Sequence, residues 1–194
     1  MADRHTLPME WKYSSVGVRS LAVGIASLSC GKEALAAVQP ETRFALANPM
    51  SAKWHDGQVV IDSAECVKRL AGDEGVETMN FAAVKQSLGP LMSPFLSITL
   101  TLFGATPDSI LKRTNNSLRS VILNVETEWQ VTGPHSGLLV TKYPDAVVDV
   151  SWSCWKGAIR FVYELCGATG EIVRRREGAT DRSLLFDCSW KKSR

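Results

Sequence analysis

The sequence predicts an α+β fold, in which N-terminal helices pack with a C-terminal β-β-α-β-β unit whose strands form a four-stranded antiparallel sheet. Two observations lead to this prediction. The spacing of apolar residues changes from the period of a helix to that of a strand near Val121. Beyond that point, two pairs of strand-like runs flank one amphipathic helix at residues 151–166. We expect a single domain over residues 1–194, mainly helical over 16–119 and β-β-α-β-β over 120–190.

Residues 1–15 show no strong period, although Trp11 and Tyr13 alternate with charged neighbours and allow a short strand or an ordered arm. Short helices are expected from residue 16 onward. Residues 16–28 are mostly small and apolar, and Gly17 and Gly24 would let this helix approach a neighbour closely. Two further helices are expected over residues 32–38 and 40–46, the second of which starts with a proline that suits a first helical turn. These segments therefore predict helices, the first of which packs closely against a neighbouring part of the protein.

Later helices are separated by glycine and proline breaks. They are expected over residues 62–70, 77–88, 90–103 and 107–118. Asp62 or Ser63 can cap the first of these helices, and Gly72 follows its end. Gly89-Pro90 separates the second helix from the third, and Thr106 can cap the last.

From Val121 onward, apolar residues recur at every second position, as they do in a strand. Alternate residues on one face are apolar or β-branched, namely Val121, Leu123, Val125, Thr127, Trp129 and Val131. This alternation is typical of a half-buried antiparallel strand. Residues 132–137 are rich in glycine, proline and serine, and they predict a hairpin loop that leads into a second strand over 138–143.

The amphipathic helix and two last strands complete the unit. One stripe of the helix carries Trp152, Trp155, Ile159, Val162 and Cys166. Ser151 can cap its start, and Gly167 stands where a C-terminal cap is expected. Strands are expected over residues 171–177 and 184–190, and Phe186 and Trp190 share one face of the last strand.

Composition narrows the class of protein. The 194 residues are 45% hydrophobic and 22% charged, with a net charge of only +2, which argues against a dedicated nucleic-acid or anionic-membrane binder. The five cysteines form no C-x-x-C pair, which favours reduced thiols. The N-terminus lacks an apolar signal region, and the apolar stretches 21–28 and 91–103 are too short to span a bilayer. We expect a cytoplasmic protein with no transmembrane segment and no nucleic-acid partner.

No motif predicts catalysis or a metal site. The nucleotide-binding, zinc-protease and serine-hydrolase signatures are absent from the sequence. Three dispersed histidines, none with a cysteine or carboxylate at ligand spacing, argue against a metal ion. His55, beside Asp56 in the loop expected over residues 50–57, could serve as a general base, and Cys154 could be reactive. A structural role is the favoured interpretation of both.

The aromatic residues carry the strongest functional signal. Tryptophans from the predicted sheet and its helix could line a cavity beneath the helical layer, or they could simply fill the core. A cavity with few polar groups would suit a hydrophobic small molecule or an acyl chain. The candidate ligand-binding residues are Trp54, His55, Phe103, Trp129, Trp152, Trp155 and Ile159.

Several long motifs carry a resemblance. The segments PETRFALANPMSAKWHDG, GPLMSPFLSITLTLFGATPDSILKR, GPHSGLLVTKYP and WSCWKGAIRFVYELCGATGE resemble a family of proteins of about this length that is best known from myxobacteria. The strand–strand–helix–strand–strand unit also resembles the superfamily of vinyl-4-reductase domains, TRAPP subunits and haem-nitric-oxide-binding domains. That resemblance implies a small-molecule sensor, a lipid-pocket adaptor or a scaffold, often dimeric through its helices.

The resemblance does not extend to the haem-binding signature. Haem-binding members need a proximal histidine on a helix and a Y-x-S-x-R motif, and this sequence lacks that signature. No cofactor is therefore predicted. The leading hypothesis is a non-catalytic domain that binds a hydrophobic small molecule, as a ligand-responsive sensor or adaptor. The alternatives are a homodimeric scaffold that uses the helix over residues 91–103, and an enzyme of unrecognised class in biosynthesis that uses Trp54, His55 and Asp56.

Overall fold

The computed structural model describes residues 10–103 and 106–192, and it describes residues 88–103 and 117 by their backbone only. The helices are α1 (Ser15–Ala26), α2 (Gly31–Ala37), α3 (Pro40–Ala47), η1 (Pro49–Ser51), α4 (Gln58–Phe103), α5 (Pro107–Leu111), α6 (Thr114–Leu118) and α7 (Ser151–Leu165). The strands are β1 (Lys12–Ser14), β2 (Trp54–Asp56), β3 (Ile122–Leu123), β4 (Glu126–Gly133), β5 (Ser136–Lys142), β6 (Ala168–Arg175) and β7 (Ser183–Lys192). Among the described helices, none combines the length and hydrophobicity that crossing a membrane requires.

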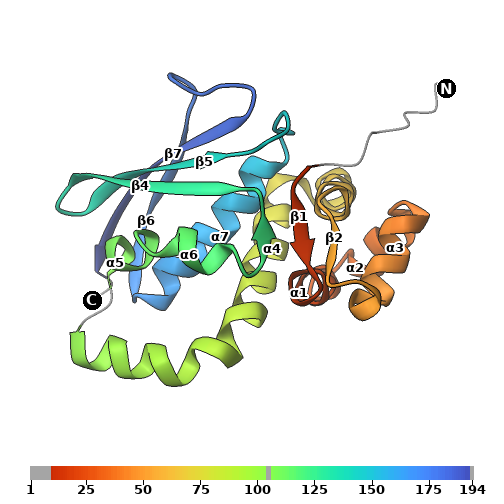
Figure 1. The fold of residues 1–194 in the computed structure, drawn as a ribbon, viewed down its shortest axis with the longest axis horizontal. Coiled ribbons are helices and arrows are strands. Elements are labelled where there is room, and N and C mark those ends of the chain that lie inside the picture. Colours follow the sequence, from red (N-terminus) through yellow and green to blue (C-terminus); the bar gives the residue numbers. More distant parts are fainter. Residues whose placement is uncertain (1–9, 104–105, 193–194) are drawn as a thin grey trace.

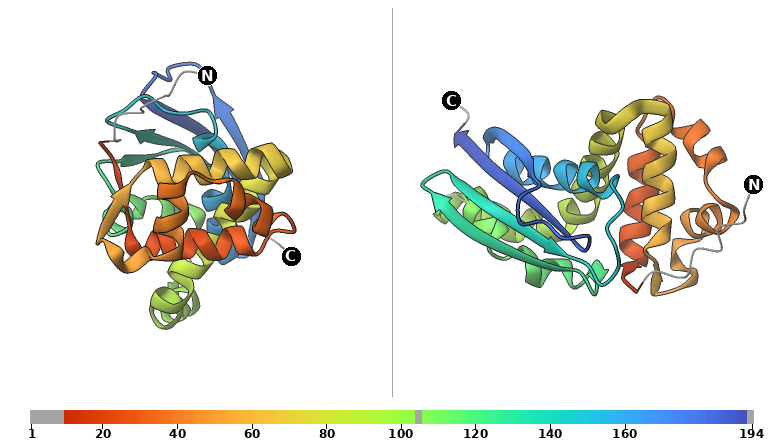
Figure 2. Two further views of the ribbon diagram at one scale, coloured as in Figure 1. Left: turned by 90° about the vertical axis from the view of Figure 1, so that its right-hand side faces the viewer. Right: turned by 90° about the horizontal axis from the view of Figure 1, so that it is seen from above.

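The main sheet confirms the predicted fold class. Its four strands are all antiparallel and follow the order β4-β5-β7-β6. Helix α7 covers one face of this sheet and packs against α4 on its other side, while α4 also packs against α1 (Figures 1 and 2). The short helices α5 and α6 lie beside α7, β4 and β5. Helix α7 is therefore sandwiched between the sheet and the helical layer.

A second, small sheet differs from the prediction. Strand β1 pairs with both β2 and β3 in a three-stranded antiparallel sheet. Two expectations are thereby wrong: the loop over residues 50–57 contains β2, and the strand expected over 121–131 is split into β3 and β4. The split lies at Asn124, whose φ of 63° turns the backbone. Asparagine tolerates this left-handed conformation better than most residues do.

Helix α4 is longer than predicted. Three helices were expected between residues 62 and 103, whereas one element begins at Gln58 and departs from helical geometry at Gly72. The break at Gly72 is confirmed, with a φ of 68° that glycine adopts readily. The start is wrong by several residues, because a carboxylate oxygen of Asp56 accepts a hydrogen bond from the Gln58 backbone N–H. The break at Gly89-Pro90 is also wrong, because the helical backbone continues through both residues to Phe103. The φ of proline fits a helix, although the residue has no N–H for a backbone hydrogen bond.

The remaining helix ends largely follow local rules. Ser14 caps α1 by accepting a hydrogen bond from the Gly17 N–H, and Thr106 forms the predicted cap of α5. The single helix expected over 107–118 is instead the pair α5 and α6. Helix α7 is confirmed with Gly167 after its end at a φ of 58°. Its N-cap is Val150 and not the predicted Ser151, so no side-chain hydrogen bond from the N-cap closes this end of the helix.

Close packing of α1 on α4 confirms the role expected for Gly24. A β-carbon at this position would collide with the backbone carbonyl oxygen of Met79 in α4. The side chains that face this contact, including Leu21 and Ile25, are fully buried. Helix α1 is thus joined to α4 by a contact that tolerates no added atom.

Candidate ligand-binding cavity

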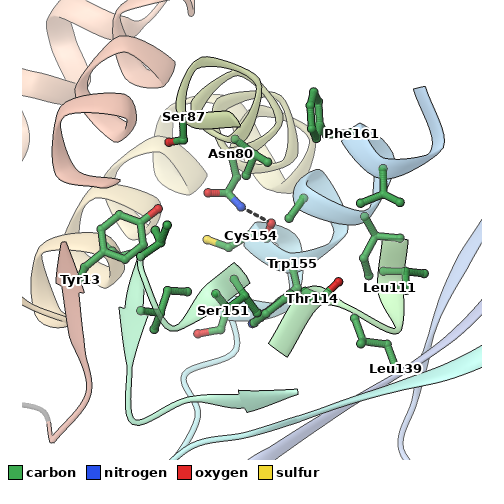
Figure 3. Close-up of a pocket in the computed structure, with 18 of the residues that line it drawn as sticks. Tyr13, Asn80, Ser87, Leu111, Thr114, Leu139, Ser151, Cys154, Trp155 and Phe161 are labelled. Carbon is green, nitrogen blue, oxygen red and sulfur yellow. Dashed lines mark hydrogen bonds between the residues drawn. The ribbon is translucent and has the colours of Figure 1, made fainter. Parts of the chain in front are cut away.

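A mainly apolar cavity of about 160 Å³ lies next to α7 (Figure 3). Residues from α4, α5, α6, β1, β3 and β5 complete its described wall. These elements are far apart in the sequence, and the fold brings them together because α7 is enclosed between the sheet and the helical layer. This volume is similar to the roughly 150 Å³ of an engineered protein cavity that binds benzene.

Helix α7 supplies one wall. Its contributors recur at helical spacing and are Ser151, Cys154, Trp155, Ala158, Ile159, Phe161, Val162 and Leu165. Trp155 is buried, and its indole N–H donates a hydrogen bond of 2.7 Å to the hydroxyl of Tyr143. The ring of Tyr143 also meets the edge of Trp11, with ring centroids 5.7 Å apart. This side of the cavity is therefore held by well-packed aromatic side chains.

The rest of the described wall comes from α4, the short helices α5 and α6, the small sheet and the β5 region of the main sheet. Their described side chains are mainly apolar and comprise Trp11, Tyr13, Val60, Ile61, Asn80, Val84, Ser87, Ile110, Leu111, Thr114, Leu118, Val121, Ile122, Leu139 and Tyr143. Asn80 is the buried amide among them, and its side-chain N–H donates to the backbone carbonyl of Cys154. This bond joins α4 to the first turns of α7 at the edge of the cavity.

Burial keeps the acidic groups of the cavity neutral. It raises the pKa of the Cys154 thiol to about 12. It also raises the pKa of the Tyr13 and Tyr143 hydroxyls, with the neighbouring Cys154 adding to the rise in both cases. The thiol and both phenols are therefore protonated at neutral pH. This environment opposes the formation of a nucleophilic thiolate at Cys154.

Of the seven candidate residues, two lie in this cavity. Trp155 and Ile159 line it, as the stripe on the amphipathic helix suggested. Trp152 instead stacks on Phe186 of the sheet, with ring centroids 4.7 Å apart. Trp129 packs against Trp190, and its indole N–H donates to a carboxylate oxygen of Asp108 at 2.8 Å.

Two of the other three candidates lie outside the cavity, and the side chain of the third is not among the described residues. Trp54 and His55 belong to β2, and the His55 ring N–H donates to the carbonyl oxygen of Pro49 at 2.7 Å. The Asp56 carboxylate forms an ion pair with Lys12 and accepts a hydrogen bond from the Gln58 N–H at the start of α4. The Phe103 side chain lies outside the described residues, as do those of the segment 91–103 that the homodimer hypothesis invokes. Ligand binding by any of the seven stays a prediction.

Sequence reasoning missed several residues of the wall. Trp11 and Tyr13 alternate with charged neighbours, and this pattern allowed a short strand. It did not indicate which other elements that strand would contact. Asn80 gave a weak indication of its place in the wall. It lies at helical spacing from Val84 and Ser87, so it is a polar residue on the face of α4 that borders the cavity. Tyr143 follows β5 directly and carried no signal of its own.

No family model and no curated protein sequence matches this chain. Its fold is similar to that of solved H-NOX (haem-nitric-oxide-binding) domains. An oxygen-binding H-NOX domain related to soluble guanylate cyclases, in its oxygen complex, gives a TM-score of 0.62 at 10% identity, over 92% of this chain and 95% of that one. The unliganded Fe(II) H-NOX protein from K. algicida gives a TM-score of 0.59 at 9% identity, over 93% of this chain and 97% of that one.

A third structure, which addresses the mechanism of H-NOX activation, gives a TM-score of 0.59 at 10% identity over 93% and 97% of the two chains. The predicted resemblance to the haem-nitric-oxide-binding superfamily is therefore confirmed at the level of fold. The resemblances to the vinyl-4-reductase and TRAPP branches, and to the myxobacterial family, stay predictions.

The described residues of the cavity do not fit haem, the group after which the H-NOX family is named. Haem iron is held in proteins by histidine, cysteine thiolate, methionine or tyrosine. Among the described lining residues there is no histidine or methionine, and the Cys154 thiol and both tyrosines are held neutral. The described wall also has no arginine or lysine to pair with the haem propionates. In the described parts of the chain, no group of three His, Cys, Asp or Glu side chains could hold a metal ion.

Proposed function

We propose that this protein is a non-catalytic domain that binds a small apolar molecule and serves as the ligand-responsive part of a sensor or adaptor. The observation that carries this proposal is the cavity of about 160 Å³ beside α7, whose described wall is mainly apolar. Transfer of an apolar ligand from water to such a wall stabilises the complex by roughly 25 cal/mol per Å² of buried apolar surface.

The cavity is too large to be an ordinary packing defect. Protein interiors are close-packed, and most of their voids are no larger than a water molecule. The cavity is partly open to the surface, so a small molecule can enter it. A ligand of matching size would remove the apolar wall from water, and this supports a binding role.

The fold and the position of α7 support a responsive role. The similar H-NOX structures include an oxygen-binding domain, so this architecture can accommodate a small ligand. In this chain α7 lines the cavity on one face, and on another face Lys156 and Arg160 form ion pairs with Glu77 of α4. A ligand that displaces α7 would change these contacts with the helical layer.

A cavity-filling substitution tests the proposal, with toluene as the probe. Ala158 lies on the α7 wall, and Ala158→Leu would place three more carbons in the cavity. We expect toluene to change the tryptophan fluorescence of the unmodified protein, because Trp11 and Trp155 line the cavity. We also expect it to raise the Tm, as any ligand specific for the folded state does. In Ala158→Leu the toluene affinity should fall at least about tenfold.

The matched control is Ala37→Leu, which makes the same exchange at an exposed position of α2. It should leave the toluene affinity as it is. Equal toluene binding by Ala158→Leu and the unmodified protein would place the binding site elsewhere and contradict the proposal. Failure of the unmodified protein to take up toluene, in fluorescence and in native mass spectrometry alike, would contradict it as well.

A further inference from the structure

One end of the cavity carries polar atoms that the fold leaves unused. Tyr13 is 8% exposed, and its ring packs against Gly17 at the start of α1. No described residue forms a hydrogen bond with its hydroxyl, which belongs to the cavity wall (Figure 3). Among the described side chains, Thr127 Oγ1 is the fully buried polar atom without a partner, so the Tyr13 hydroxyl keeps some accessible surface. A ligand in the cavity could therefore form a hydrogen bond with this hydroxyl.

Two neighbouring groups complete this polar end. The Asn80 amide N–H donates to the carbonyl of Cys154, and its side-chain oxygen, which points toward the Tyr13 side in Figure 3, has no described donor. The Tyr143 hydroxyl accepts from Trp155 and has no described acceptor for its own proton. The polar end therefore offers a ligand both hydrogen-bond donors and an acceptor.

The same wall lacks charge. No aspartate, glutamate, lysine, arginine or histidine occurs among its described residues. The Tyr13 and Tyr143 hydroxyls and the Cys154 thiol stay neutral, because burial disfavours a negative charge at each of them. An ionic ligand would lose its hydration here and gain no counter-ion, which carries a large free-energy penalty.

We infer that the cavity selects an uncharged molecule that carries one oxygen head group, such as a hydroxyl, on an apolar body of about the size of benzene, and that Tyr13 determines this specificity. This inference rests on the proposed function, because it names the class of ligand for the same cavity. A ligand hydroxyl would accept from the Tyr13 hydroxyl and donate to the Asn80 oxygen. The apolar body would lie against Ile159 and the α7 wall.

Three probes of similar size separate the contributions. Phenol has the hydroxyl, toluene replaces it with a methyl group, and benzoate carries a negative charge at neutral pH. We expect phenol and toluene to bind and benzoate to show no detectable binding, as measured by tryptophan fluorescence and by ligand-observed NMR. In Tyr13→Phe the phenol affinity should fall about tenfold, because the ligand loses a hydrogen-bond partner in a buried site. The toluene affinity should change less than about twofold, since its contacts are apolar.

The control is Tyr163→Phe, which removes another buried tyrosine hydroxyl. This hydroxyl donates to the Glu171 carbonyl at 3.3 Å and does not line the cavity. It should leave the affinities for phenol and toluene unchanged. If Tyr13→Phe keeps the phenol affinity while toluene still binds, or if benzoate binds as tightly as phenol, the inference is overturned and the proposed function stands. If neither phenol nor toluene binds the unmodified protein, both fail.

Discussion

Two faces of helix α7 are packed in opposite ways. Toward α4 the contact is so close that a β-carbon on Gly157 would collide with the backbone carbonyl oxygen of Glu77. Toward the cavity the next residue, Ala158, borders an open space of about 160 Å³. Adjacent residues of one helix thus meet a fully packed contact and a partly open cavity.

This difference indicates where α7 is fixed and where it can adapt. The α4 face combines the glycine contact with a hydrogen bond of 2.8 Å from the Ser153 hydroxyl to Asp73 and with the ion pairs of Glu77. The cavity face relies on apolar side chains with few directional bonds. Close packing resists the addition of atoms, whereas a void accepts them, so substitutions on the two faces should have opposite effects.

The largest expected effect is on the packed face. Gly157→Ala should lower the free energy of unfolding by about 3 kcal/mol, because the α7–α4 contact must open to admit the methyl group. Urea denaturation followed by circular dichroism measures this change. Gly133→Ala is the control, since a β-carbon there meets only the movable side-chain oxygen of Ser136. Equal stability of the two variants would show that the α4 face is not tightly packed.

The ion pairs of that face should contribute less. Lys156 and Arg160 lie 2.7 and 3.3 Å from the carboxylate of Glu77, whose side chain is only 11% exposed. Glu77→Gln should lower the unfolding free energy by about 1–2 kcal/mol, and added salt should reduce the difference. Glu164→Gln breaks an exposed pair with Lys85 and should cost less than about 0.5 kcal/mol. A Glu77 effect no larger than that of Glu164 would argue against a role in fixing α7.

The buried thiol on the cavity face of α7 should make the free energy of unfolding fall at alkaline pH. Burial raises the pKa of the Cys154 thiol to about 12, well above the roughly 8.5 of an unfolded thiol. The neutral thiol therefore stabilises the fold below pH ~8.5, and this contribution is lost as pH rises toward 12. The loss amounts to about 1.4 kcal/mol per pH unit for one group. Cys154→Ala should reduce the slope of unfolding free energy against pH by about this amount between pH ~9 and ~10.5.

Cys188, whose pKa burial also raises to about 12, should preserve part of the slope in that variant. Urea titrations at several pH values give the slopes directly. An unchanged slope in Cys154→Ala would mean that the thiol is hydrated, and the cavity would then be open to water at this point.

Much of the fold could be predicted because its signals are local. The alternation over β5 and β7, the stripe on α7 and the glycine after its end depend on residues close together in the sequence. Errors arose where distant contacts decided the outcome. Asn124 divides the expected strand because β3 pairs with β1, more than a hundred residues earlier in the chain. Asp56 begins α4 before the expected cap because β2 places it there.

The candidate site was predicted only in part, for the same reason. The sequence by itself determined the α+β class and the helix that presents Trp155 and Ile159 on one face, since helical periodicity is a property of neighbouring residues. Only the tertiary structure decided that Tyr13 and Asn80 meet this face across a cavity, while Trp152 packs into the sheet. A cavity is space that separate elements leave between them, so no single segment encodes it.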